Sequence, residues 1–227
     1  MRAAAFFDLD HTLVLGTSTE RRFLRRLWRS GEIGPRELVH YLAQFGREPK
    51  LSGGFFRRNK AYLTGKPLER LRPLARETIQ EALAAVPPRA KECLEGHRSA
   101  GRLVVIITGT LDLLAEPLGR SLGAEVIFAT RLASRNGCLT GQVLEPYPRG
   151  ENKRVLVRRL AAERGIDLAA SYAYGDEVSD VPMLEEVGHP VAVNPSARMR
   201  QVALARGWRI DMFHEPAPAR KAERLNR

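Results

Sequence analysis

The stretch AAAFFDLDHTLV, residues 3–14, joins a short apolar run directly to two carboxylates. An unbroken apolar run of this length is typical of a buried strand. Because a buried strand has no room for two charges, Asp8 and Asp10 are expected at its carboxyl end, where it leaves the core. On an extended chain their side chains face the same way. Carboxylates this close repel each other unless a cation or a shared proton lies between them, so the stretch predicts a divalent metal site.

The length and composition are those of a globular α/β protein. With 227 residues, the chain is long enough for one substantial core and a smaller second unit. The net charge of +11 comes mainly from arginine. Such a charge suits a nucleic-acid or membrane-surface binder, an enzyme with anionic substrates, or simply an arginine-rich proteome. The arginines are spread over several segments instead of one stripe with interleaved aromatics, which disfavours a nucleic-acid partner.

The cysteines and the apolar runs help to predict the cellular compartment of the protein. Cys93 and Cys138 have no short spacing, so they predict neither a zinc motif nor a disulfide framework. The apolar residues before Asp8 are too few for a signal peptide, and the longest later run, residues 103–107, is too short to span a bilayer. We therefore expect a soluble, cytoplasmic protein with no transmembrane segment. The oligomeric state stays open.

The segment after the first strand has helical spacing and no convincing strand. The expected helices cover residues 20–29, 35–45 and 55–63 and a segment that opens at Pro67. A crossover between parallel strands needs only about a dozen residues, yet the next strand-end candidate, Thr108, lies 100 residues beyond Asp8. The residues in excess of this dozen predict an inserted domain. The expected division is a Rossmann-like catalytic core of residues 1–14 and 86–214, a helical cap of residues 15–85 and a loose basic tail of residues 215–227.

The rest of the chain alternates helices with strands. Residues 103–107 are apolar without alternation, as expected of a parallel strand covered on both faces. Asn136-Gly137, between two short β-like runs, predicts a hairpin. The other expected strands are residues 125–128, 171–174 and 191–193, the last of these ending the sheet, and the other helices lie after Pro88, over 112–121, from 151 and over 182–184. This order predicts an α/β fold, a parallel sheet with helices on both faces.

Further polar side chains stand where expected strands end or helices begin. Thr108 follows one strand, Asp176 and Asp180 follow another, and Lys153 lies in the first turn of a helix. The carboxyl ends of parallel strands meet at one edge of the sheet. Each residue alone has an ordinary structural account, as a helix cap, a loop residue or a solvated lysine. Their convergence with Asp8 on one edge favours a shared site.

In this order the pieces resemble the four motifs of the haloacid dehalogenase (HAD) superfamily of phosphatases. The motifs are DLDHT at 8–12, ITGT at 107–110, Lys153, and GDEVSDVPML at 175–184. The chain is most similar to the phosphoserine-phosphatase-like branch (subfamily IB), with the helical insert placed as a cap between the first two motifs. The resemblance covers roughly residues 3–194.

The resemblance implies catalytic roles. Asp8 would be the nucleophile that forms an aspartyl-phosphate, and Asp10 would protonate the leaving oxygen and later deprotonate water. Lys153 would neutralise the transferring phosphoryl group. The Thr108 hydroxyl and the Gly109 amide would bind its oxygens.

The resemblance also implies Mg²⁺ as cofactor. A carboxylate nucleophile is repelled by a phosphate dianion, so cations are needed. Asp8, the backbone carbonyl of Asp10, and Asp176 would hold the ion, which prefers oxygen ligands. Asp180 would be a further ligand or would orient the metal waters and Lys153.

The chain departs from the phosphoserine-phosphatase pattern at two positions. Those enzymes usually carry a glutamate nine residues after the nucleophile, which meets the substrate ammonium; here Thr17 stands there and Glu20 follows three residues later. Ser179 replaces an asparagine before the last aspartate. Arg57 or Arg58 in the insert is the candidate for the substrate-side arginine, and Arg58 is included in the expected phosphate-binding set. The core set is complete, but the departures argue against phosphoserine as the substrate.

The sequence therefore predicts an enzyme, a Mg²⁺-dependent phosphatase that hydrolyses a small phosphomonoester through an aspartyl-phosphate. An alternative on the same fold is a phosphotransferase or a lipid-headgroup phosphatase, because a basic surface suits an anionic membrane. An alternative of another class is a nucleic-acid-binding protein that retains an inactive phosphatase fold.

Overall fold

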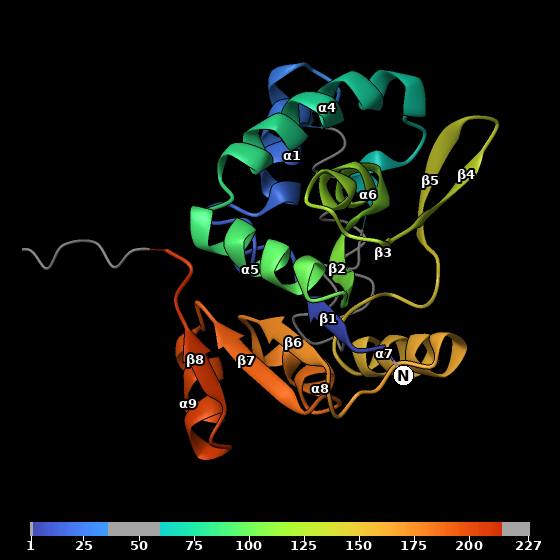
Figure 1. Cartoon of the computed structure of the whole chain (residues 1–227). Helices are drawn as coiled ribbons and strands as arrows, with labels where there is room; N and C mark the ends of the chain where they lie inside the picture. The colour runs from blue at the N-terminus through green and yellow to red at the C-terminus, as the bar shows by residue number, and fades with distance from the viewer. Residues whose placement is uncertain (1, 36–59, 215–227) are drawn as a thin grey trace, which may run out of the picture.

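The computed structural model describes residues 2–35 and 60–214, which form an α/β fold around one parallel sheet (Figure 1). The six strands of the sheet lie in the order β3-β2-β1-β6-β7-β8, and every neighbouring pair is parallel. Their bounds are β1 (Ala4–Phe7), β2 (Leu103–Leu111), β3 (Val126–Thr130), β6 (Tyr172–Gly175), β7 (His189–Val193) and β8 (Arg209–Asp211). The expected fold class is confirmed.

The strand β1 lies inside the sheet, and its side chains alternate between the two faces. Ala5 and Phe7 pack on one face, while Ala4 and Phe6 pack on the other. All four are fully buried. A parallel strand covered on both faces needs apolar residues at every position. The first charged side chain, Asp8, therefore appears only where the strand has ended.

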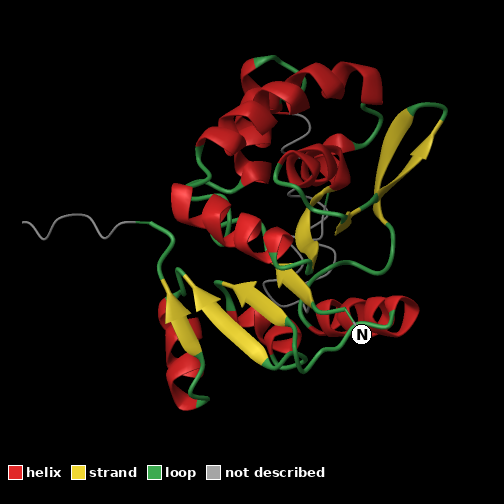
Figure 2. Ribbon diagram, viewed as in Figure 1, coloured by secondary structure: helices red, strands yellow, loops and turns green. Residues whose placement is uncertain are grey.

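Helices cover both faces of the sheet (Figure 2). One face packs against α5 (Pro88–Ser99) and α6 (Asp112–Ser121), and the other against α7 (Glu151–Arg164), α8 (Val181–Leu184) and α9 (Ala197–Ala205). The two apolar clusters have no buried residue in common, so the sheet separates two cores. In the part of the chain that the structure describes, no helix has both the length and the apolar character needed to cross a membrane.

The segment between β1 and α5 builds a helical layer beyond the sheet (Figure 1). It contains α1 (Thr19–Arg29), the 3-10 helix η1 (Ala61–Leu63) and α4 (Leu68–Ala84). Phe23 and Leu27 of α1 join Leu71 and Ala75 of α4 in a third apolar cluster. The cap boundaries at residues 14 and 85 stay predictions. Three expected segments lie wholly or mostly outside the described residues: the helix over 35–45 except its first residue, the helix over 55–63 except its last four residues, and the tail of 215–227.

The expected hairpin is formed by β4 (Leu132–Arg135) and β5 (Cys138–Val143), which pair antiparallel. Its turn residues Asn136 and Gly137 have φ angles of 51° and 76°, and a type I′ turn needs positive φ at both positions. The hairpin also pairs with the chain that enters α4. The Gly65 amide donates to the Leu139 carbonyl at 2.7 Å, and the Leu139 amide donates to the Lys66 carbonyl at 3.0 Å. Backbone hydrogen bonds thus join the hairpin to the helical layer.

Two elements differ from expectation. The strand β2 does not end at Ile107 but continues to Leu111, with a shift of register against β3 between these residues. Thr108 therefore lies within the strand, at its irregular end. The expectation that residues 191–193 end the sheet is wrong, because α9 and then β8 follow and β8 pairs with β7. With two charged side chains among its three residues, β8 lacks the apolar run by which the other strands are found.

Candidate active site

The carboxyl ends of β1, β2 and β6 border a cavity of about 720 Å³ that α1 also lines. The residues predicted from the sequence converge on it. Among the residues that the structure describes, the predicted site residues that line the cavity are Asp8, Asp10, Thr108, Gly109, Lys153, Asp176 and Asp180. Arg58 lies outside the described residues. The structure therefore brings together every predicted site residue that it describes.

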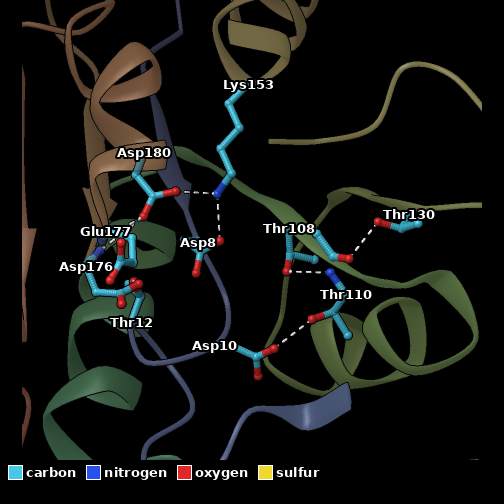
Figure 3. Close-up of polar contacts among 11 residues, drawn as sticks. Asp8, Asp10, Thr12, Thr108, Thr110, Thr130, Lys153, Asp176, Glu177 and Asp180 are labelled. Carbon is cyan, nitrogen blue, oxygen red and sulfur yellow. Dashed lines mark hydrogen bonds and ion pairs between the residues drawn. The ribbon is translucent and has the colours of Figure 1, made fainter. Parts of the chain in front are cut away.

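Three carboxylates meet at one point of this cavity. Ligand oxygens of Asp8, Asp176 and Asp180 all lie within 4.8 Å of one another. The Lys153 ammonium, which is almost fully buried, donates to Asp8 Oδ1 at 2.6 Å and to Asp180 Oδ1 at 2.7 Å (Figure 3). When all three carboxyl groups are ionised, the one ammonium offsets one of the three negative charges, so two remain. A remainder of two charges among oxygen ligands fits a hard divalent cation such as Mg²⁺.

Burial raises the pKa of two of these carboxyl groups. Loss of water raises the pKa of Asp8 to about 7, although Lys153 opposes the shift. Burial, and then the charges of Asp8 and Asp180, raise the pKa of Asp176 to about 9. Burial alone would lower the pKa of Lys153, but the carboxylates of Asp180 and Asp8 raise it above its ordinary value. The carboxyl cluster thus holds protons near neutral pH, and a divalent cation would replace them.

The backbone after β6 fixes Asp180 in this cluster. Asp180 Oδ2 accepts hydrogen bonds from the Asp176 amide at 3.2 Å and the Glu177 amide at 3.1 Å. A Cβ at Gly175 would lie only 2.5 Å from the Asp180 Cβ, so this close approach requires glycine. Asp180 therefore contacts the Lys153 ammonium with one oxygen and the turn backbone with the other.

Asp10 is held separately from the carboxylate cluster (Figure 3). Its Oδ1 accepts hydrogen bonds from the Thr19 amide at 2.7 Å and the Thr19 hydroxyl at 2.6 Å, and its Oδ2 accepts one from the Thr110 hydroxyl at 2.7 Å. Its side chain does not join the cluster of Asp8, Asp176 and Asp180, and the sequence analysis had proposed only its backbone carbonyl as a metal ligand. Sequence reasoning missed both threonines as partners of Asp10, although Thr110 is the last residue of the predicted motif ITGT.

Hydrogen bonds of threonine side chains connect further groups at the ends of the strands (Figure 3). The Thr108 hydroxyl oxygen accepts a hydrogen bond from the Thr110 amide at 3.2 Å. The Thr130 hydroxyl donates to the Gly109 carbonyl at 2.6 Å. On the other side of the cluster, the buried Thr12 hydroxyl donates to Asp176 Oδ1 at 3.2 Å. The loop ends are thus fixed before any substrate arrives.

The side of the cavity formed by the helical layer carries a different kind of group. Glu20 lines it, accepts a hydrogen bond from the Tyr62 hydroxyl at 2.6 Å and forms an ion pair with the buried Lys60. Thr17 is not among the described lining residues, whereas Ser179 is. Glu20 therefore reaches the cavity in spite of its shifted position, but its charge is already balanced.

A family model described as haloacid dehalogenase-like hydrolase matches residues 5–185. This span runs from β1 through α8 and includes all four motifs. The chain belongs to the haloacid dehalogenase-like hydrolase family. The predicted family is confirmed, and the HAD motifs are the ones that border the cavity.

Relatives of this HAD hydrolase include proteins named as phosphatases. The chain is 39% identical over 225 residues to the inhibition of morphological differentiation protein of Streptomyces azureus, covering 95% of this chain and 80% of the relative. It is 36% identical over 233 residues to phosphoserine phosphatase SerB1 of Mycobacterium tuberculosis (strain ATCC 25618 / H37Rv), covering 99% and 74%. It is 28% identical over 222 residues to a histidinol-phosphatase of Neisseria meningitidis serogroup C (strain 8013), covering 94% and 100%. The predicted enzyme class, a HAD-type phosphatase, is confirmed, and the named relatives differ in substrate.

Solved structures share the HAD fold of this chain. A protein of unknown function from Bordetella pertussis Tohama I superposes with a TM-score of 0.81 at 29% identity, covering 94% of this chain and 100% of the other. A phospho-aspartyl intermediate analogue of phosphoserine phosphatase superposes with a TM-score of 0.68 at 23% identity, covering 94% of each chain. The second likeness shows a common fold and nothing about the substrate.

Proposed function

We propose that this protein is a Mg²⁺-dependent phosphatase that hydrolyses a small phosphomonoester through a phosphorylated Asp8. The observation that carries the proposal is the meeting of Asp8, Asp176 and Asp180 with the Lys153 ammonium in one buried cluster. The relatives named for the hydrolysis of phosphomonoesters support it. The cluster lies at the edge of the sheet where a substrate in the cavity can reach it.

In the first step, an Asp8 carboxylate oxygen attacks the phosphorus atom, and the bond from phosphorus to the ester oxygen breaks. Asp10 donates its carboxyl proton to that oxygen, so the product leaves as an alcohol. The hydrogen bonds from Thr19 and Thr110 hold the Asp10 carboxyl group in the orientation that this transfer needs.

In the second step, Asp10 acts as the base. Its carboxylate takes a proton from water, and the water oxygen attacks phosphorus. The bond from phosphorus to the Asp8 oxygen breaks, which releases inorganic phosphate and restores the Asp8 carboxylate. The net reaction adds one water across the ester bond and needs no oxidant or reductant.

Other groups stabilise the charge that moves during both steps. The Lys153 ammonium neutralises negative charge on the phosphoryl group, while the Thr108 hydroxyl and the Gly109 amide donate to its oxygens. When bound, Mg²⁺ supplies the positive charge that lets a carboxylate approach a phosphate. The groups that would hold it are the carboxylates of Asp8, Asp176 and Asp180 and the backbone carbonyl of Asp10.

A phosphate-release screen tests this proposal. The wild-type protein and Asp8→Asn are assayed on phosphoamino acids, sugar phosphates, nucleotides and phospholipid headgroups, with Mg²⁺ or with EDTA. Added alcohol acceptors test the phosphotransferase alternative. We expect release only with Mg²⁺, and a loss of about three orders of magnitude or more in kcat for Asp8→Asn. The exposed Glu163→Gln serves as a control and should keep wild-type activity. An Asp8→Asn protein that hydrolyses as fast as wild type would refute the nucleophile assignment.

A further inference from the structure

One face of α1 lines the cavity and stays partly exposed. Arg21, Leu24, Arg25 and Trp28 recur at three- and four-residue steps, so their side chains share a face of the helix, and all four line the cavity. The opposite face of α1 is buried against α4. Leu24 and Trp28 keep 38% and 51% of their surface exposed. Large apolar side chains left exposed inside a concave site favour a ligand that covers them.

The unpaired charges on this face are positive. In the described part of the chain, the guanidinium groups of Arg21 and Arg25 form neither an ion pair nor a hydrogen bond. Glu20, the one carboxylate that the described helical layer contributes to the lining, is already paired with Lys60. On this face of α1, a substrate ammonium would therefore meet two guanidinium groups and no uncompensated carboxylate. A carboxylate or phosphate would instead find the planar donors that bind such groups well.

The length of α1 sets the distance over which a ligand would extend. Thr19, which contacts Asp10, precedes Trp28 by nine residues, which corresponds to about 13 Å along a helix with a rise of about 1.5 Å per residue. Arg25 lies about 9 Å along the same axis. The cavity of about 720 Å³ is also within the size range of sites for drug-sized ligands. A short amino-acid phosphate at Asp8 would leave most of this face uncovered.

We infer that the substrate is a phosphomonoester whose alcohol part is longer than that of phosphoserine, has an apolar or aromatic body and bears a second negative charge. The body packs on Leu24 and Trp28, and the charge pairs with Arg21 and Arg25. This inference rests on the proposed function, because the reaction at Asp8 fixes where the phosphoryl end of the substrate lies.

A matched series of aryl phosphates tests the inference. The three compounds are 4-ethylphenyl phosphate, 3-(4-phosphonooxyphenyl)propanoate and 2-(4-phosphonooxyphenyl)ethylamine. Each releases a 4-alkylphenol, and they differ in the charge at the far end. We expect kcat/KM to be highest for the carboxylate and lowest for the amine, with a ratio of about tenfold between them. Phosphoserine should have a lower kcat/KM than 3-(4-phosphonooxyphenyl)propanoate. A preference for the amine would overturn the inference.

Variants of α1 identify the residues responsible. In Arg21→Gln/Arg25→Gln, the ratio of kcat/KM for the carboxylate over the amine should fall towards one. Trp28→Ala should raise KM about fivefold for all three aryl phosphates and leave the charge ratio as in wild type. Arg29→Gln, which changes an exposed arginine of the same helix outside the cavity lining, is the matched control and should change neither quantity. An unchanged charge ratio in the double variant would refute the role of the two arginines.

A binding measurement separates this inference from the proposed function. The dissociation constants of the three compounds are measured on Asp8→Asn with Mg²⁺, where no turnover is needed. Tighter binding of the carboxylate than of the amine, lost in the triple variant with Arg21→Gln and Arg25→Gln, supports the inference even if the hydrolysis assay fails. If hydrolysis depends on Asp8 but the carboxylate and the amine compounds bind with equal affinity, the proposed function is supported and the inference is refuted.

Discussion

The two sides of the cavity are built in opposite ways. On the sheet side, Asp180 and Lys153 are almost fully buried, and the Lys153 ammonium binds both Asp180 and Asp8. On the side of α1, Arg25 and Trp28 are exposed, and the arginine has no ion-pair partner within the described chain. Removing one member of a buried polar network leaves its partners without hydrogen bonds and lowers the free energy of unfolding. Substitution of an exposed side chain usually changes that free energy little. We therefore expect the sheet edge to determine the reaction type and α1 to influence substrate choice.

The largest effect on stability is expected from Lys153→Met, which removes the buried ammonium of the sheet side. Asp8 and Asp180 would lose their partner, and breaking a buried ion pair costs about 3–5 kcal/mol of unfolding free energy. The kcat should fall about 10²- to 10³-fold with the loss of charge stabilisation. Urea denaturation and steady-state kinetics measure the two effects. The exposed Lys91→Met is the matched control, and equal losses in both variants would break the contrast between buried and exposed sides.

Gly175→Ala tests the sheet side by adding one methyl group next to Asp180, without changing any charge. The added Cβ would meet the Asp180 Cβ at 2.5 Å, so Asp180 must move. We expect a loss of about 1–3 kcal/mol of unfolding free energy and weaker binding of Mg²⁺. Gly96→Ala is the control, because it lies in α5 with nothing within 4 Å of the added Cβ and should gain about 0.5–1 kcal/mol from helix propensity. A Gly175→Ala protein as stable as Gly96→Ala would contradict the crowding argument.

The dependence of stability on pH sharpens the comparison further. Asp8 and Asp176 have pKa values in the folded protein of about 7 and about 9, above their ordinary value of 3.8. The folded protein therefore keeps protons that the unfolded chain has released, so without metal its unfolding free energy decreases as pH rises from about 4 through about 9. Mg²⁺ replaces these protons, so the increase in Tm over EDTA should be larger near pH 8 than near pH 5.5.

Scanning calorimetry with Mg²⁺ and with EDTA at several pH values measures this effect. Asp176→Asn removes one of the titrating groups, so its Tm should depend less on pH and respond less to Mg²⁺. A rise in Tm on adding Mg²⁺ that is the same at every pH would show that the carboxyl groups hold no extra protons.

The smallest effect on stability is expected from Trp28→Ala on the side of α1. Because half of its surface is exposed, the unfolding free energy should change by no more than about 0.5 kcal/mol. Leu27, the preceding residue on the buried face, provides the comparison, since Leu27→Ala should cost about 2–5 kcal/mol. Chemical denaturation of both variants checks the difference. A large loss in Trp28→Ala would mean that this side chain supports the fold.

Much of the sheet side was predictable from the sequence because its signals are local. The change from an apolar run to a carboxylate marks the end of a strand at Asp8, and the same change marks Asp176. The Asn136-Gly137 turn likewise has a specific conformational requirement that few residues meet. The role of Lys153 is different, because a lysine in a helix has no local signal and only the family motif indicated it.

The parts that were missed depend on contacts between distant residues. Glu20 and Lys60 lie 40 positions apart, and no local pattern shows that one balances the other. The strand β8 forms because β7 offers a free edge, not because its own three residues favour a strand. Thr110 binds Asp10 across 100 residues. Sequence patterns thus locate the ends of elements better than they locate partners.

The backbone pairing of the hairpin with residues 65–68 links motions of the two layers. Lifting α4 away from the sheet must either break these hydrogen bonds, at about 0.5–1.5 kcal/mol each, or carry β5 along. Val143, the last residue of β5, precedes Lys153 by ten residues. Such a movement of β5 would in turn pull on the loop that leads from the hairpin to the ammonium beside Asp8.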